Sequence, residues 1–436
     1  MLVNGIKLNR ILEIEGISPT RLYQYIDKAY ESCVRFNSDR SSNLKRALNR
    51  IADKGEAIYL ATDRQDYLVN WPLRNAREAI VIRCVATVDS GSGFVFRHDV
   101  GIDDRVNADE INSLAAASGD LLKSPPVRKY AQYILGADID YMARLNAYIQ
   151  QQVETALLEG WVSDSIEAKY YDAQLREDIE LPSGHIGSDT QLPRELMLIR
   201  EDYALYAHYH LLGDVLPDEL EVVNFADFES GLRAAFMAAF AGRVLQGTAH
   251  LFNVTFKKGP VREEREAAAG RARRILDQAA AASGGSEALG KWTLCREVLE
   301  RHLSMVGPYR DRMADFPWET KTEVEKRFIC QTFRSDLDLD RLADHLVKAS
   351  LHQVDTYFQQ VRRRISGLER GIPTASKDRR IWHGNHFYRP DMVRKSIEIF
   401  RTFKNYHYLP KTSKQTPASS LGVAKGQVKW RDIINY

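Results

Sequence analysis

The sequence predicts an α/β fold built on one mixed sheet that long helical segments interrupt. Two stretches, residues 55–99 and 219–257, carry the short apolar or alternating runs that are typical of strands, and the segments around them have helical periodicity. In each stretch an aspartate directly follows the first strand-like run, at Asp63 and at Asp227. Two carboxylates delivered in this way indicate a site at one edge of the sheet.

The bulk composition is that of a soluble globular protein. The 436 residues are enough for two or three domains, and contents of 44% hydrophobic and 28% charged residues are ordinary. No run approaches the ~18 apolar residues of a membrane span, and the opening segment MLVNGIKLNRIL lacks the apolar core of a signal peptide. The four cysteines are scattered without a Cys-x-x-Cys pair, which fits a cytoplasmic location and argues against a structural zinc module.

The charge is distributed unevenly along the chain. From Thr356 to the end, 17 Lys and Arg face five Asp and Glu, a net charge of +12. Because the whole chain carries only +2, the preceding residues carry −10. A basic end on an acidic body predicts that a polyanion binds at that end.

Residues 1–54 are predicted to form a helix-turn-helix region that binds DNA. A short amphipathic helix, LNRILEI, ends at Glu15-Gly16, and Ser18-Pro19 has the residue types of a helix start. A second helix over Arg21–Phe36 follows, with apolar residues at three- and four-residue steps. The residues expected to face a DNA groove are Thr20, Arg21, Gln24 and Tyr25. Any helical hairpin has this pattern, so a purely structural pair of helices is the alternative.

Residues 55–104 are predicted to form the first part of the sheet. Ala57–Thr62 is a short, mostly apolar strand that we expect to end at Asp63. Ala79–Val88 is rich in valine and isoleucine, and Phe94–Phe96 resumes a strand after the turn signal DSGSG. A carboxylate at the end of a buried first strand, followed by a meander, is how an RNase H-like sheet presents its first metal ligand. A meander of another α/β protein with a surface aspartate is the alternative.

Residues 105–200 are predicted to be a helical insertion into this sheet. The clearest helix in it runs over Met142–Gly160, with apolar residues at helical spacing. The aromatic-rich segment that follows contains His208 and His210. Either histidine could bind a metal ion, but aromatic core packing explains this segment better.

Residues 201–260 are predicted to be the second part of the sheet domain. A strand over Glu219–Ala226 delivers Asp227, and Glu229 lies two residues further on. A helix over Ser230–Phe240 and a strand over Thr248–Lys257 complete the unit. Strand, aspartate, helix and strand in this order are typical of the second half of an RNase H-like domain.

Residues 261–330 are predicted to be a second helical insertion, and residues 331–370 to carry the last catalytic helix. Leu337–Gly367 has the periodicity of one or two strong helices, with Asp355 in the middle. A cluster of three arginines follows one or two turns later, and it is predicted to grip DNA phosphates: Arg362, Arg363 and Arg364. A solvated basic helix face remains the alternative for at least one of them, because three consecutive positions cannot all point the same way.

Residues 371–436 are predicted to be a basic, aromatic tail. Aromatic side chains alternate there with cations, a pattern that suits contacts with nucleic-acid bases and phosphates. Arg379 and Arg380 are the predicted DNA contacts of its first part.

Three separated blocks together resemble bacterial insertion-sequence transposases of the DDE class. The first is ATDRQDYLVNW with the strands after it, and the second is NFADFESGLRAAF. The third runs from QVDTYFQQVRRRISG through Asn405-Tyr406 to Thr416-Pro417-Ala418 and Leu421-Gly422-Val423-Ala424. The blocks cover about 250 residues in the order that the fold requires, so the resemblance implies an RNase H-like catalytic domain.

The resemblance implies a catalytic and metal-binding triad of Asp63, Asp227 and Asp355, which would hold two Mg²⁺ or Mn²⁺ ions about 4 Å apart. Many relatives have Glu at the last position, and the shorter Asp355 moves the ligand by about the length of one C–C bond. Glu369 is the fallback third ligand, although at 3.6 residues per turn it lies about four turns beyond Asp355. The neighbouring competitors are Asp66, Asp89 and Glu229.

Three functions fit this sequence. The resemblance implies a transposase that nicks element ends and joins them to target DNA, acting as a homo-oligomer on double-stranded DNA in the cytoplasm, associated with the nucleoid and not with a membrane. The missing cysteine-rich module and the aspartate at position 355 favour a catalytically degenerate relative, a DNA-binding protein with a regulatory or defence role. A metal-dependent nuclease without strand transfer differs only in the fate of the 3′-hydroxyl.

Overall fold

A seven-stranded mixed sheet forms the centre of the molecule. The structure is a computed structural model that describes residues 1–70, 79–136, 138, 196–303, 313–334, 336–369, 372–373, 381–382, 385–410 and 413–436. The strands lie in the order β3-β2-β1-β6-β7-β9-β8. Their bounds are β1 Ile58–Asn70, β2 Ala79–Asp89, β3 Val95–Val100, β6 Val222–Ala226, β7 Ala249–Thr255, β8 Ala314–Asp315 and β9 Arg327–Cys330.

The connections make one half of the sheet antiparallel and the other half partly parallel. β1, β2 and β3 form an antiparallel meander, whereas β6 pairs parallel with β1 and β7 pairs parallel with β6. β9 and β8 then add antiparallel strands beside β7. The predicted mixed α/β sheet is therefore confirmed, as are strands close to the expected bounds of β2, β3, β6 and β7.

Two predictions about the strands are wrong. β1 does not end at Asp63 but continues to Asn70, because β2 pairs with it residue by residue from Leu60↔Asp89 to Asn70↔Ala79. The parallel partner β6, in contrast, leaves β1 after Thr62↔Ala226. The stretch predicted to be a second helical insertion contains β8 and β9 as well as helices, and these strands extend the sheet beyond β7.

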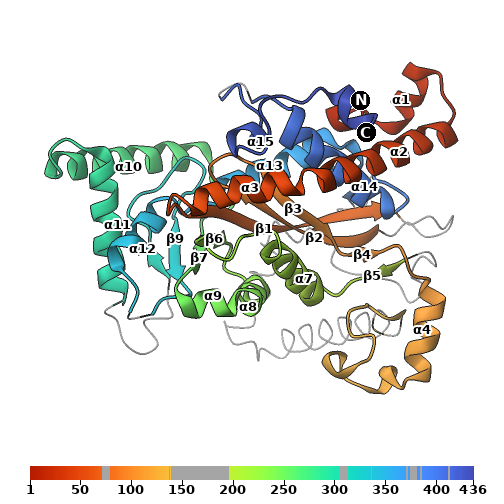
Figure 1. Cartoon of the computed structure of the whole chain (residues 1–436), viewed down its shortest axis with the longest axis horizontal. Helices are drawn as coiled ribbons and strands as arrows, with labels where there is room; N and C mark the ends of the chain where they lie inside the picture. The colour runs from red at the N-terminus through yellow and green to blue at the C-terminus, as the bar shows by residue number, and fades with distance from the viewer. Residues whose placement is uncertain are drawn as a thin grey trace, which may run out of the picture.

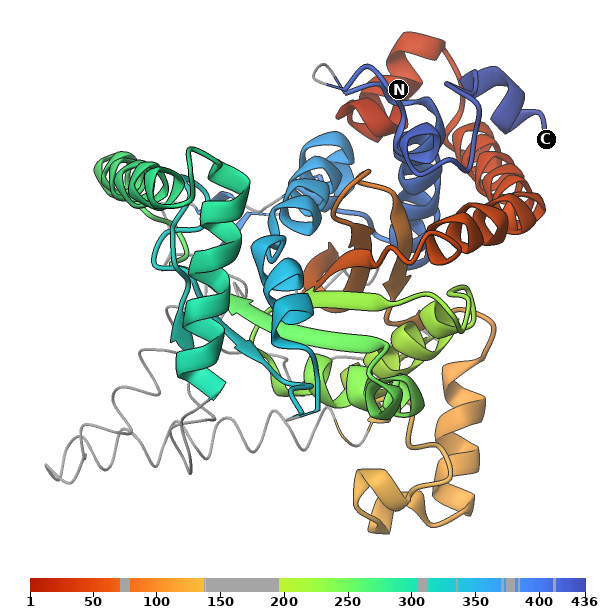
Figure 2. The same cartoon turned by 60° about the vertical axis from the view of Figure 1, so that its left-hand side comes forward.

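Helices cover both faces of the sheet (Figures 1 and 2). On one face, α13 contacts β1 and β2, and α14 contacts β3. On the other face, α7 contacts β2 and β3 and also packs on α8. The bounds of these helices are α7 Glu201–Gly213, α8 Ser230–Ala239, α13 His352–Arg364 and α14 Asp391–Thr402. The core between the layers is dense and aromatic, with fully buried Tyr209, Phe225, Phe236, Phe252 and Tyr357.

The N-terminal helices follow the predicted start and stop signals. α1 (Leu8–Glu15) ends at Gly16, whose φ of 61° is a left-handed conformation that glycine adopts without strain. α2 (Pro19–Asp39) begins after Ser18, whose side chain accepts a hydrogen bond from the backbone N–H of Arg21. α2 packs along α14 and α16 (Trp430–Ile434), and α3 (Ser41–Ala52) follows it. Both termini lie at the same end of the molecule (Figures 1 and 2).

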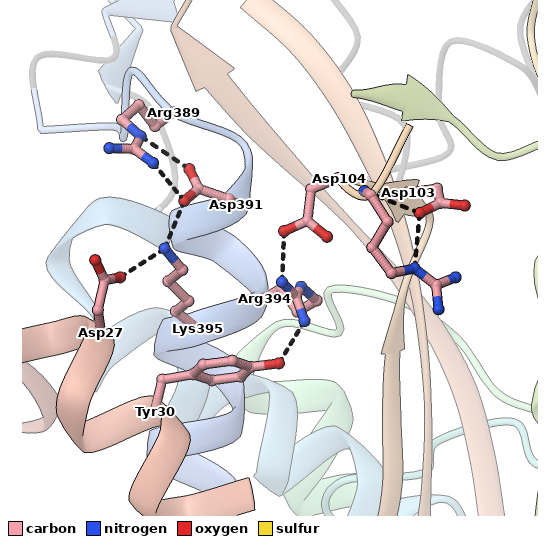
Figure 3. A network of polar contacts seen from close by, with 9 residues as sticks. Asp27, Tyr30, Asp103, Asp104, Arg389, Asp391, Arg394 and Lys395 are labelled. Carbon is pink, nitrogen blue, oxygen red and sulfur yellow. Dashed lines mark hydrogen bonds and ion pairs between the residues drawn. The ribbon is translucent and has the colours of Figure 1, made fainter. Parts of the chain in front are cut away.

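Polar contacts fix α2 against α14 (Figure 3). The ammonium of Lys395 on α14 lies 2.6 Å from a carboxylate oxygen of Asp27 on α2 and 2.7 Å from one of Asp391. The adjacent Arg394 donates hydrogen bonds to the hydroxyl of Tyr30 on α2 and to the carboxylate of Asp104. The inner face of α2 is thus held to the sheet domain, while Arg21, Gln24 and Tyr25 lie on its exposed face.

A helical hairpin and a small α/β unit project from the sheet (Figure 1). The hairpin consists of α10 (Arg262–Ala282) and α11 (Glu287–Leu303), which pack on each other. The small unit contains α4 (Ala108–Ala117) and the short strands β4 (Ile102–Asp103) and β5 (Met197–Leu198). The predicted helix over Met142–Gly160 lies outside the described residues. None of the described helices has the length and apolar character to cross a membrane.

Asn405 and Tyr406, which carry part of the sequence resemblance, have structural contacts here. The side-chain amide of Asn405 accepts a 2.9 Å hydrogen bond from the backbone N–H of Val95 and donates another of 2.9 Å to its carbonyl. The amide of Asn405 therefore forms hydrogen bonds with the outer edge of β3, as the backbone of a neighbouring strand would. The ring of Tyr406 packs edge-on against Phe36 of α2 and against Phe94. This pair of residues joins α2, α14 and the edge of the sheet.

Replacing Asn405 with alanine is expected to lower the free energy of unfolding by about 2 to 6 kcal/mol. The substitution leaves both backbone groups of Val95 buried without a partner, and each such loss costs about 1–3 kcal/mol. Urea denaturation followed by circular dichroism measures the change. The matched control is Asn49→Ala on the exposed face of α3, which should change stability by no more than about 0.5 kcal/mol. Equal effects of the two substitutions would show that the Val95 contacts do not stabilise the fold.

Candidate active site

Asp63 and Asp227 lie beside each other where β1 and β6 diverge. The last register pair of these parallel strands is Thr62↔Ala226. Asp63 is the next residue of β1, and Asp227 is the first residue after β6. Side chains on one strand alternate between the faces of a sheet. Asp63 shares its face with Tyr59, whose hydroxyl contacts His345, a residue of α12 (Leu339–Val347). The carboxylate of Asp63 is thereby directed to the side of the sheet that α12 and α13 cover.

Asp355 approaches from the helix packed across this part of the sheet. It lies in the first turn of α13, two and three residues before the buried Tyr357 and Phe358. Leu337–Gly367 was predicted to form one or two helices, and it forms two, α12 ending at Val347 and α13 starting at His352; the predicted mid-helix position of Asp355 is wrong, because it lies in the first turn of α13. The break between the helices brings the N-terminal end of α13 and its carboxylate to the sheet.

The electrostatics of the three aspartates show that they share one site. Burial raises the pKa of Asp63 well above its usual value, and the charges of Asp355 and Asp227 raise it further. Burial likewise raises the pKa of Asp355 to about 6, and the charges of Glu323 and Asp227 add to this shift. Like charges held close together disfavour ionisation. The fold thus brings together the three carboxylates that the sequence predicted. Burial and mutual repulsion disfavour their ionised forms, and a bound cation would offset this effect.

A buried ion pair holds the start of α13 in place. The carboxylate of Glu323 accepts hydrogen bonds from the hydroxyl of Ser350 at 2.6 Å and from the backbone N–H of Leu351 at 3.0 Å. Lys326 lies 2.8 Å from the same carboxylate, and both side chains are almost fully buried. The sequence gives no signal for Glu323, because it lies 32 positions before Asp355 in a segment of ordinary composition.

The side chain of Lys258 and the backbone of Arg64 also contact the aspartates. The ammonium of Lys258 lies 3.5 Å from a carboxylate oxygen of Asp227. The backbone N–H of Arg64 donates a 2.8 Å hydrogen bond to Asp63, while its guanidinium pairs with Glu229 at 2.6 Å and with Glu201. Glu229, a competing ligand in the sequence analysis, is therefore engaged with Arg64 on the opposite face of β1 from Asp63.

The other competing carboxylates lie elsewhere. Asp66 follows Asp63 by three positions on β1, so its side chain points to the opposite face. Asp89 is buried at the end of β2 and accepts hydrogen bonds of 2.6 Å from the N–H and the hydroxyl of Ser92 in the turn to β3. Glu369 is exposed beyond the end of α13. The described structure therefore leaves Asp63, Asp227 and Asp355 as the group at the junction of β1 and β6.

The three predicted phosphate-binding arginines of α13 have different surroundings. The charge of Arg362 lowers the pKa of Asp355 against the raising effects of burial and of its acidic neighbours, so this guanidinium lies near the site. Arg363 is exposed. Arg364 instead donates a hydrogen bond of 3.1 Å to the side chain of Asn4 and lies over the ring of Tyr408. Arg379 and Arg380 lie outside the described residues.

His208 is a core residue, as the aromatic segment around it predicted. It is fully buried, and its ring nitrogens contact Asp99 at 2.6 Å and the hydroxyl of Thr87 at 2.7 Å. The hydroxyl of Thr87 contacts that of Thr62, which donates to Asn224, so the polar chain crosses β3, β2, β1 and β6. His210 is exposed on α7. Neither histidine lies with the three aspartates.

Comparisons of the chain with models of protein families, with curated proteins and with solved structures give no match.

Proposed function

We propose that this protein is a DDE-type transposase that cuts and joins DNA strands by metal-dependent phosphoryl transfer. The observation that carries the proposal is the shared site of Asp63, Asp227 and Asp355, three carboxylates from distant segments. The strand order β3-β2-β1-β6-β7, with the first three strands antiparallel and the next two parallel to β1, agrees with an RNase H-like sheet. Both features support the resemblance that the three sequence blocks indicated.

The chemistry of the donor set fits Mg²⁺ or Mn²⁺. The site offers carboxylate oxygens, the ligands that hard divalent cations prefer. Burial and, to a smaller extent, the charges of neighbouring carboxylates raise the pKa values of Asp63 and Asp355, and divalent charge would relieve that repulsion. Asp63, Asp227 and Asp355 would hold the ions, and the bound ions would supply activation of the attacking hydroxyl and stabilisation of the leaving oxygen.

The remaining residues of the site would position the DNA and the ligands. Glu323 and its hydrogen bonds to Ser350 and Leu351 fix the start of α13, and with it the carboxylate of Asp355. Arg362, whose charge lowers the pKa of Asp355, would contact a scissile phosphate, and the exposed Arg363 would contact the backbone further along. The exposed face of α2 with Arg21, Gln24 and Tyr25 would bind element ends, with the basic tail completing the contact.

A nicking and joining assay tests the proposed function. Supercoiled plasmid is incubated with the full chain in Mg²⁺, in Mn²⁺ and in a chelator, and nicked and strand-transfer products are separated on denaturing gels. We expect products only with a divalent ion. Nicks without joined products would point to a nuclease, whereas DNA binding with no nicking in either ion would overturn the enzymatic proposal.

The second candidate is a DNA-binding relative that has lost catalysis. Lys258 lies 3.5 Å from Asp227, so a cation of the protein itself already compensates one carboxylate. Asp355 is also one methylene shorter than the glutamate of many relatives that the sequence resembles. If Lys258 takes the place of a metal ion, Lys258→Met should increase Mg²⁺ affinity and restore nicking. If the wild type already nicks DNA, this candidate fails.

A further inference from the structure

A second group of ligating side chains lies at the other end of the strands. The Nε2 atom of His345 lies 2.9 Å from Oε1 of Glu221, and the Nε2 atom of His250 lies 3.3 Å from the same oxygen. One donor atom of each residue lies within 4.8 Å of those of the other two. Two imidazoles thus converge on one carboxylate oxygen, with both histidines buried.

The three residues come from three separate segments. Glu221 immediately precedes β6, His250 is in β7 and His345 is in α12. Asp227, in contrast, follows the other end of β6. Six positions of extended chain separate Glu221 from Asp227, about 20 Å at a rise of about 3.3 Å per residue. The group is therefore distinct from the aspartate site.

Neighbouring side chains orient this group from outside. The hydroxyl of Tyr59 lies 3.2 Å from Nδ1 of His345, on the side of the ring away from Glu221. Arg341 donates hydrogen bonds to Oε2 of Glu221, the oxygen that the histidines do not contact. Outer contacts of this kind fix the ring and carboxylate of metal ligands in known sites. A cavity of about 230 Å³ lined by Tyr59, Arg341, Asp344 and Lys348 opens beside it.

We propose that Glu221, His250 and His345 form a binding site for a zinc ion. Two imidazole nitrogens and one carboxylate oxygen are a donor set that Zn²⁺ binds, with a fourth position open to water. The same set suits Mg²⁺ poorly, because Mg²⁺ prefers oxygen ligands. The proposal is independent of the function of the aspartate site.

The protonation states agree with a role as ligands. Burial would raise the pKa of Glu221, but hydrogen bonds from His250, His345 and Arg341 hold it below its usual range, so the carboxylate is ionised. Burial lowers the pKa of His345 and outweighs its contact with Glu221, which leaves the ring neutral at neutral pH. A neutral imidazole and an ionised carboxylate are the forms that bind a metal ion.

A bound ion would tie α12 to the starts of β6 and β7. Because the ligands are far apart in the sequence, they come together only in the folded chain, and zinc binding would therefore stabilise it. α12 leads directly into α13, which carries Asp355. Zinc would thus strengthen the scaffold on which the aspartate site is built.

Zinc binding to the full chain, stripped of metal with a chelator, tests the proposal. Isothermal titration calorimetry should show one tight site, and the melting temperature should rise when one equivalent of Zn²⁺ is added. His250→Gln and Glu221→Gln should each weaken that site by at least about 100-fold, because each removes one of three ligands. Asp63→Asn, at the other site, and His210→Ala, an exposed histidine, should leave zinc affinity unchanged.

A spectroscopic measurement covers the case in which a variant does not fold. Long-range ¹H–¹⁵N spectra of wild-type protein with labelled histidines should show two of the 11 histidines shifting at Nε2 when one equivalent of Zn²⁺ is added. The proposal is overturned if no tight site is found, if folded His250→Gln binds zinc like the wild type, or if Asp63→Asn abolishes the binding.

Discussion

Asp63→Asn is expected to lower the rate of Mg²⁺-dependent strand cleavage by more than about 100-fold, because even residues that only support metal ligands contribute about 10–100-fold. The amide keeps the size of the side chain but removes the charge of one of the three carboxylates. Single-turnover nicking of plasmid DNA in Mg²⁺ measures the rate, and a gel-shift assay should show unchanged DNA binding. The matched control is Asp66→Asn, on the same strand but on the opposite face, which should retain the wild-type rate.

The same substitution should stabilise the metal-free chain. The folded-state pKa of Asp63 is raised, so the folded chain binds its proton more tightly than the unfolded chain does. The stability gained from this proton is present at low pH and is lost as the pH rises through the raised pKa. At neutral pH Asp63→Asn should therefore raise the melting temperature in chelator, and Mg²⁺ should stabilise the wild type but not the variant. If Asp63→Asn instead lowers the melting temperature in chelator, the inference that the carboxylates repel one another at this site is wrong.

Cleavage is also expected to fall steeply as the pH is lowered through about 6. Asp355 binds a cation only when it is ionised, and burial together with the charges of Glu323 and Asp227 raises its pKa to about 6. Lys258 and Arg362 face the same carboxylate and act in the opposite direction. Rates of nicking between pH 5 and 8, at an Mg²⁺ concentration near half-saturation, should report this titration. Saturating Mg²⁺ should move the midpoint to lower pH, because the ion competes with the proton.

Glu323→Gln supplies the control for this pH profile. The substitution removes a charge that raises the pKa of Asp355 but leaves an amide oxygen to accept from Ser350 and Leu351. The midpoint of the rate profile should move to lower pH. A profile that does not change in this variant would show that another group controls the titration.

Strand positions were predictable where local composition settles them. Ala79–Asp89 is rich in β-branched residues, and its strand emerges almost as predicted. The second half of β1 was not predictable, because Arg64, Gln65 and Asp66 are polar and their strand conformation depends on pairing with β2. β8 and β9 are two and four residues long, and they depend on tertiary pairing, because β9 pairs with β7 and β8 pairs with β9.

The candidate site was predictable only in part, for a similar reason. Asp63 and Asp227 follow apolar runs that place them next to each other once the strands pair. Glu323 and Lys258 join the site through tertiary contacts that no local pattern signals. The histidine group at the other end of the strands is harder still to predict from the sequence, since Glu221, His250 and His345 are single residues in unrelated segments.

The packing of α2 on α14 and α16 has a consequence for how the protein is made. The ribosome completes α2 within the first tenth of the chain, but α14 and α16, which cover its apolar side, belong to the last 46 residues. Leu22, Ile26 and Phe36 consequently stay uncovered while nearly all of the polypeptide is synthesised. During that time the exposed apolar stripe is a natural target for chaperones, and the N-terminal region acquires its final fold only after residues 391–434 have been synthesised.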